Sequence, residues 1–316
     1  MTNNIKIAIK CLTFSLSLCS ANVFATTIEP LDKDYTLQIL GSGGPISDDL
    51  RASSGAVIWW KGQSKFMIDA GGATFLRFGQ SGAKLEDLDF LGITHFHTDH
   101  VADVPAILKG GYFFNRTNPL YIAGPTGGSG FPSLTGYINA LFNPQYGAYA
   151  YLNGLTTGDG IFPIIPIDVP YKKKKNATVV YNKDDIVISA FGIPHGNVPC
   201  LAYRFDTKKG SIVISADQNG TNSDFINFAK GADILVMPGA IHEDADEEVS
   251  AFMHAKPSTV GKIAAQINPK LLVIDHWMGM SLKKQKEVLE IIKKYYHGEV
   301  FAARDLSSYP ITAIKK

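Results

Sequence analysis

The sequence has little cysteine and no strong excess of charge of either sign. Only three of its 316 residues are cysteine, and its 30 basic residues nearly balance its 29 acidic residues, which gives a net charge of +1. Cys11 and Cys19 lie close to the start of the chain, and Cys200 stands alone in an apolar setting that predicts a buried structural thiol. The balanced charge gives no global electrostatic reason to expect a nucleic-acid partner.

The first 25 residues have the pattern of a leader. Lys6 and Lys10 give a positive start, 11–19 is a short apolar run, and Val23-Phe24-Ala25 offers small residues where cleavage occurs. This pattern predicts a signal peptide at 1–25, cleaved after Ala25, and a periplasmic or secreted protein. The apolar run is too short to span a bilayer comfortably, so no membrane span is expected after cleavage. An uncleaved anchor is the alternative. Cleavage would leave Cys200 without a partner for a disulfide.

Histidine and aspartate gather in the segment 94–100, which reads Thr-His-Phe-His-Thr-Asp-His. Imidazole and carboxylate are the usual ligands of zinc and similar metals. An apolar run at 88–93 predicts a strand before the segment, and 101–108 resembles the start of a helix. Alternate residues of an extended chain point the same way, so His95 and His97 can hold one metal. A turn at Thr98 then lets Asp99 and His100 face a second point nearby. A polar loop with locally bonded histidines is the alternative.

Three more polar residues follow predicted strands. His195 lies between strand-like runs at 185–191 and 201–205, Asp217 follows a run at 211–215, and His276 follows the predicted last core strand at 271–274. Asp69 ends a predicted hairpin at 55–60 and 65–68. Loops at strand ends are where a rigid scaffold presents functional side chains.

The H-x-H-x-D-H pattern at 95–100 resembles that of the metallo-β-lactamase-fold hydrolases, and the resemblance covers nearly all of the chain after residue 30. It implies an α/β fold at 30–316, a four-layer αββα sandwich of two mixed β-sheets flanked by helices. It also implies two divalent metal ions, with zinc first and manganese or iron as alternatives. The implied ligands are His95, His97 and His195 for one metal, Asp99, His100 and His276 for the other, and Asp217 as the bridge.

The resemblance also implies how such a site would work. A hydroxide shared by the two metals would attack the substrate, with Asp99 and His254 as the catalytic residues. His254 resembles the histidine that helps the leaving oxygen in ribonuclease Z-like members, as a general acid or electrophile, and His242 competes for this role. Asp69 would order the metal loop without binding metal, and Asp275 could tune His276. The aspartate at 217 argues against a β-lactamase, which carries cysteine there.

Residues 111–185 form an aromatic-rich insertion with many glycines, prolines and asparagines. It predicts a wall or lid of the substrate pocket, while packing against the core or a subunit contact in a homodimer is the alternative. The lysine run at 172–175 is interpreted as a solvated loop tip.

These features predict an exported hydrolase that cleaves a phosphodiester or a sulfate ester of a small organic substrate, of the phosphodiesterase or arylsulfatase type. The leader and the lack of a long basic arm argue against ribonuclease Z, so no nucleic-acid polymer is expected as a partner. A lactone or thioester hydrolase of the same fold, and a metal-binding scaffold without catalysis, are the alternatives. Carbonyl chemistry would depend less on His254.

Overall fold

The computed structural model describes residues 34–311, except 115, 173–175, 247 and 249. The chain divides into two compact units, Met1–Leu31 and Asp32–Lys316, and every described residue belongs to the second. The predicted leader at 1–25 therefore lies outside the described residues and stays a prediction. Within the described ranges, no helix is both long and apolar enough to cross a membrane.

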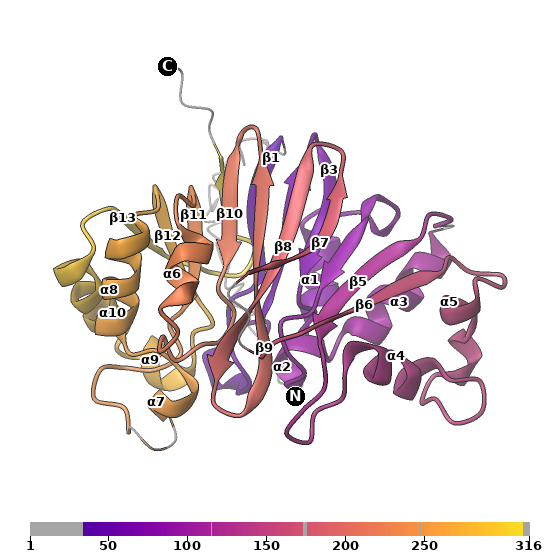
Figure 1. Cartoon of the computed structure of the whole chain (residues 1–316), viewed down its shortest axis with the longest axis horizontal. Coiled ribbons are helices and arrows are strands. Elements are labelled where there is room, and N and C mark those ends of the chain that lie inside the picture. The colour runs from indigo at the N-terminus through magenta and orange to yellow at the C-terminus, as the bar shows by residue number, and fades with distance from the viewer. Residues whose placement is uncertain (1–33, 115, 173–175, 247, 249, 312–316) are drawn as a thin grey trace, which may run out of the picture. The chain divides into compact units, whose positions relative to one another are not determined.

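The described strands form two mixed sheets of seven strands each (Figure 1). The first sheet has the order β14 (Ser308–Pro310), β1 (Tyr35–Gly41), β2 (Gly55–Trp60), β3 (Gln63–Ile68), β4 (Phe90–Gly92), β5 (Leu120–Pro125) and β6 (Ile164–Val169). The second has the order β13 (Glu299–Ala302), β12 (Leu271–Asp275), β11 (Ile234–Pro238), β10 (Gly210–Ile214), β9 (Val198–Thr207), β8 (Ile186–His195) and β7 (Thr178–Lys183). Each sheet is antiparallel in one half and parallel in the other.

Helices cover the outer faces of both sheets (Figure 1). The helices beside the first sheet include α1 (Thr74–Gln80), α3 (Val104–Phe113), α4 (Leu134–Phe142) and α5 (Gly154–Thr157). The second sheet packs against α6 (Asp224–Ala229), α8 (Pro257–Ile267) and α10 (Gln285–Tyr295). Short helices near the site are α2 (Thr98–Val101), α7 (Ser250–Met253) and α9 (Gly279–Leu282), and single 3₁₀ turns lie at η1 (Ser47–Asp49), η2 (Leu85–Asp87) and η3 (Ala150–Leu152).

The strand patterns explain why the layers pack. In β2, Ala56, Ile58 and Trp60 belong to the core between the sheets, whereas Val57 and Trp59 are buried on the other face. Successive residues of a strand point to opposite faces, so a strand that is apolar throughout must be covered on both sides. The two sheets and two helical layers follow from this requirement, and the predicted four-layer fold is confirmed.

The C-terminal part differs from the prediction in two ways. The strand at 271–275 is not the last, because β13 and β14 add an edge to each sheet. These strands have four and three residues and weak patterns of their own, so pairing with β12 and β1 stabilises them. The helix expected at 281–296 is divided into α9 and α10, because Lys284 has a non-helical backbone.

The aromatic-rich range 111–185 is not separate from the sheets. It contributes β5 and β6 to the first sheet and β7 to the second. Only the stretch between Pro125 and Ile164, with α4 and α5, lies between sheet strands at length.

Candidate metal centre

The loop that carries the histidines is fixed by a buried aspartate. Asp69 directly follows β3 and has a left-handed backbone, with φ of 57°. Its carboxylate accepts hydrogen bonds from the backbone N–H of Thr94 at 2.7 Å, from the Thr94 hydroxyl at 2.7 Å and from Nδ1 of His100 at 2.8 Å. Burial raises the pKa of Asp69, and the bonds to His100 and Thr94 act in the opposite direction. Asp69 thus connects the end of β3 to both ends of the loop.

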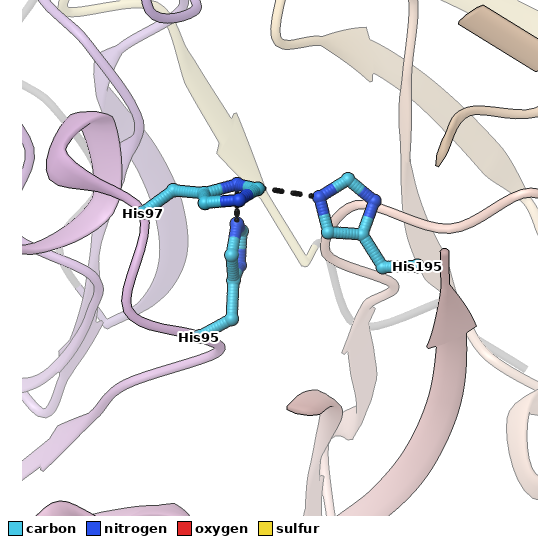
Figure 2. A group of neighbouring side chains, drawn as sticks. All are labelled: His95, His97 and His195. Atoms are coloured by element: carbon cyan, nitrogen blue, oxygen red, sulfur yellow. Dashed lines mark hydrogen bonds between the residues drawn. The ribbon is translucent and has the colours of Figure 1, made fainter. Parts of the chain in front are cut away.

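One group of three histidines comes from two distant parts of the chain (Figure 2). Nδ1 of His97 lies 2.9 Å from Nε2 of His95 and 3.4 Å from Nε2 of His195. Burial lowers the pKa of all three imidazoles, which keeps them neutral at neutral pH. Nδ1 of His195 donates to the backbone carbonyl of Met253 at 2.7 Å, so its Nε2 presents a lone pair to the group. Converging lone pairs of this kind need a shared proton or a cation between them.

A second group lies beside the first. Nε2 of His276 is 3.2 Å from Oδ2 of Asp99, 3.1 Å from Oδ2 of Asp217 and 3.3 Å from Nε2 of His100. His100 donates through Nδ1 to Asp69, which again leaves Nε2 facing the group.

The second group is strongly polarised. Burial alone would raise the pKa values of Asp99 and Asp217, but His100 and His276 hold both well below the usual range. In turn, burial would lower the pKa of His276, but Asp217 and Asp99 raise it to about 10. The pKa of His100 is likewise raised by Asp69 and Asp217 against the effect of burial. The carboxylates are therefore ionised at neutral pH and carry the charge that a metal ion requires.

Asp217 lies where the two groups meet. It forms one potential metal-binding group with His95 and His100, and another with His195 and His254. The structure thus brings together all seven predicted ligands, while their binding of metal stays a proposal. The carboxyl ends of β8, β10 and β12 run in one direction and bring His195, Asp217 and His276 to one edge of the second sheet.

His254 belongs to the same site, and His242 does not join it. Nδ1 of His254 lies 3.9 Å from Oδ2 of Asp217, whereas His242 is in none of the potential metal groups among the described residues. Burial lowers the pKa of His254 to about 3, although Asp217 opposes the shift. The imidazole is therefore neutral at neutral pH, which favours a hydrogen-bond donor over a standing general acid.

The groups open into a cavity of about 410 Å³. Its lining consists of Pro45, Phe96, His97, Thr98, Asp99, Asp217, His254 and His276. No described residue of 111–185 is in this lining, but the ring of Phe131 lies 5.7 Å from that of His97. The aromatic-rich range therefore approaches the site through a single turn, while Tyr112 and Phe113 are exposed elsewhere.

Some parts of the site had no signal in the sequence. The carbonyl of Met253 orients His195 from a remote loop, and any residue type could supply it. Cys200 is buried, and Sγ lies 3.7 Å from Nδ1 of His95. For Asp275, burial raises the pKa to about 7. Nδ1 of His276 has no hydrogen-bond partner among the described residues, so the expected link from Asp275 is not seen.

The donor set fits two borderline divalent cations. It combines neutral imidazoles with ionised carboxylates, and each metal-facing nitrogen of His100 and His195 is fixed by a bond at the opposite ring nitrogen. The ligand types alone admit zinc, manganese and iron.

Comparison with known proteins places this geometry in context. The model of the beta-lactamase superfamily domain matches residues 65–277. Ribonuclease Z of Clostridium tetani (strain Massachusetts / E88) is 30% identical over 298 residues, covering 76% of this chain and 88% of that relative. The crystal structure of human tRNase Z, short form, has a TM-score of 0.67 and 19% identity, covering 88% of this chain and 99% of that one. The metallo-beta-lactamase fold protein YhfI from Bacillus subtilis has a TM-score of 0.65 and 20% identity, covering 87% and 98%.

These similarities correct the functional prediction. The relatives are nucleases by name, so the expected small organic ester substrate and the expected absence of a nucleic-acid partner are wrong. The phosphodiesterase or arylsulfatase type is not supported, and nothing in the similarities supports export. The physical reason lies in the charge argument, because net charge averages over the whole chain whereas a substrate meets only one face.

Proposed function

Because the chain belongs to the beta-lactamase superfamily, we propose that it is a metal-dependent ribonuclease, which hydrolyses a phosphodiester bond of RNA. The carrying observation is the pair of ligand groups that share Asp217 at the floor of an open cavity. The ribonuclease Z relatives support RNA as the substrate class.

At the coarser level, the chain is a metal-dependent hydrolase of the metallo-β-lactamase fold with His/Asp clusters suited to metal. This makes a scaffold without catalysis unsupported. We propose zinc as the native ion. Bound ions would supply positive charge that stabilises the phosphate and would lower the pKa of an attacking water.

The protein's own residues would orient and protonate. His95, His97 and His195 would hold one ion, and Asp99, His100 and His276 the other, with Asp217 between them. Neutral His254, at the cavity wall, would donate a hydrogen bond to the departing ribose oxygen. Because its pKa is about 3, this help does not require the imidazolium form at neutral pH. Phe96 and Pro45 would limit water at the cavity wall.

A cleavage assay tests the proposal directly. Metal-depleted protein would be reloaded with zinc or manganese and mixed with end-labelled RNA, both a tRNA and an unstructured strand. The same sequences as DNA, together with a lactone and a thioester, would serve as alternative substrates. We expect RNA cleavage that chelator abolishes and Asp217→Ala removes. Turnover of lactone or thioester without RNA cleavage would overturn the proposal and favour carbonyl chemistry.

The location of this activity rests on the sequence alone. The leader at 1–25 stays a prediction, and N-terminal sequencing of the protein from separated cell fractions tests it. A mature start at Thr26 supports the prediction, and an intact Met1 contradicts it.

A further inference from the structure

A second cavity lies beside the metal centre, on the side of His195. It has a volume of about 660 Å³. Residues on both sides of the ligand line it, because Pro194 and Gly196 belong to the wall while the ring of His195 points to the metal groups. A molecule in this cavity would therefore be adjacent to a bond positioned at the metals.

One turn joins the two cavities. Gly128 and Phe131 form an isolated bridge, with Ser129 between them. Ser129 lines the second cavity, while the ring of Phe131 packs against His97 at the metal centre. The turn thus contacts both spaces, so a substrate could extend from one into the other along it.

The wall has the chemistry of a site for a sugar and its phosphate. Hydroxyl and amide side chains line it, with apolar surface from Ile193 and Val198 and one basic and one acidic group. The polar lining is Ser129, Asn197, Thr221, Asn222 and Ser223. The basic group is Lys172, which is exposed and pairs with no carboxylate among the described residues. The acidic group is Asp224.

Close packing holds the basic side of the wall in place. A Cβ at Gly192 would collide with the carbonyl of Tyr171, and one at Gly128 would collide with the Tyr171 hydroxyl. Tyr171 is thus wedged between β8 and the turn at 128–131. Lys172 follows it directly, and its Nζ lies 6.0 Å from the Tyr171 ring. The ammonium group is therefore anchored at the cavity rather than at the end of a free loop.

We propose that this cavity binds the nucleotide next to the scissile phosphate of the RNA substrate, with Lys172 contacting that nucleotide's backbone phosphate. The inference rests on the proposed ribonuclease function and adds a binding site to it. Lys172 acts in binding, since it lies outside the metal centre. Asp224 opposes the phosphate and sets a limit on affinity.

Kinetics at several salt concentrations test the site. In the metal-loaded full chain, Lys172→Ala should raise KM for RNA roughly three- to tenfold at low salt. Because one phosphate contact is lost, the slope of log KM against log salt should fall by about 0.7. Asp224→Asn should change KM in the opposite direction. Ser223→Trp, which puts a ring into the cavity from an exposed position, should raise KM at every salt concentration.

A matched control and the contrary outcomes make the test decisive. Lys208→Ala removes an exposed lysine from the turn between β9 and β10, outside both cavities, and should behave like the wild type. If the wild type cleaves RNA but Lys172→Ala keeps both KM and salt slope, the nucleotide site is overturned and the ribonuclease function stands. If the wild type cleaves no RNA, the function is overturned, and the nucleotide site with it.

Discussion

Oδ2 of Asp217 lies 3.1 Å from Nε2 of His276, and both side chains are buried at the floor of the metal centre. With Asp99, this carboxylate raises the pKa of His276 to about 10 against the effect of burial. In the metal-free protein, the imidazole is therefore protonated at neutral pH. This proton occupies the place that a metal ion would take.

Metal binding should therefore release protons, and affinity should rise with pH. Each displaced proton makes the apparent affinity increase about tenfold per pH unit below the pKa of the group. Isothermal titration of zinc between pH 6.5 and 8, in buffers of different ionisation enthalpy, measures the number released. We expect at least one, and His276→Ala should release fewer. An affinity independent of pH would contradict the assignment of His276.

The same shift has a consequence for the metal-free fold. A group whose pKa is raised on folding stabilises fully below its unfolded value of about 6.5. This contribution from His276 is lost as the pH rises through about 10. Chemical unfolding of the metal-free protein at pH 6 and pH 10 should show it as a loss that His276→Ala lacks.

Asp69 should control metal affinity without binding metal. It orients His100 through Nδ1 and holds Thr94, so Asp69→Ala should weaken metal binding by about 10–100-fold. Asp69→Asn keeps an acceptor for the Thr94 N–H and should lose less. Competition with a chromogenic chelator measures both affinities. Asp184→Asn, at the exposed β7–β8 turn, is the matched control, and equal affinity in Asp69→Ala and the wild type would disprove the role.

His254 should affect turnover and leave metal content unchanged. Removal of a positioned proton donor costs about 10²–10⁴-fold in rate, so His254→Ala should lower kcat for RNA by that order. Metal analysis should still find two ions per chain. Since the pKa of His254 is about 3, the wild-type rate should show no loss of activity from its deprotonation between pH 5 and 8.

His242 offers the matched control for this experiment. It lies in the same interval of the sequence but in none of the described metal-binding groups. His242→Ala should keep kcat within about twofold of the wild type, as expected for a residue outside the reacting groups. The reverse result, with His242 essential and His254 dispensable, would transfer the donor role to His242.

The positions of the site residues were accessible from the sequence because strand ends are readable. His195, Asp217 and His276 follow strongly apolar runs, and such runs were recognised without knowledge of their partners. The contacts that orient the ligands were not accessible. The carbonyl of Met253 meets His195 across 58 positions of sequence, and a backbone group carries no residue-type signal.

The substrate class was misread for a different reason. The exclusion of RNA relied on a net charge near zero and on the leader. A net charge says nothing about where individual charges lie, and Lys172 sits at a cavity beside the metal centre. Likewise, the edge strands β13 and β14 were missed because their stability depends on pairing with β12 and β1 rather than on their own pattern.

Tyr203 links the stability of the sandwich to the metal loop. Its buried hydroxyl lies 2.9 Å from the carbonyl of Ile93 and 3.0 Å from that of Ala123, so it joins β9 to the ends of β4 and β5. Burial raises its pKa, which keeps the hydroxyl as a neutral donor. Tyr203→Phe leaves the Ile93 carbonyl without this donor in a dry interior. We expect a loss of about 1–3 kcal/mol in the free energy of unfolding.

Thermal unfolding checks this expectation. For a domain of this size, each kcal/mol corresponds to a fall of about 2–4 °C in Tm. Tyr295→Phe is the matched control, because that side chain is 40% exposed and its hydroxyl is free to bond with water. Ile93 directly precedes Thr94, so excess zinc, which binds only the folded loop, should restore part of the lost Tm. A Tyr203→Phe protein as stable as the wild type would show that the hydroxyl contributes nothing to holding the loop.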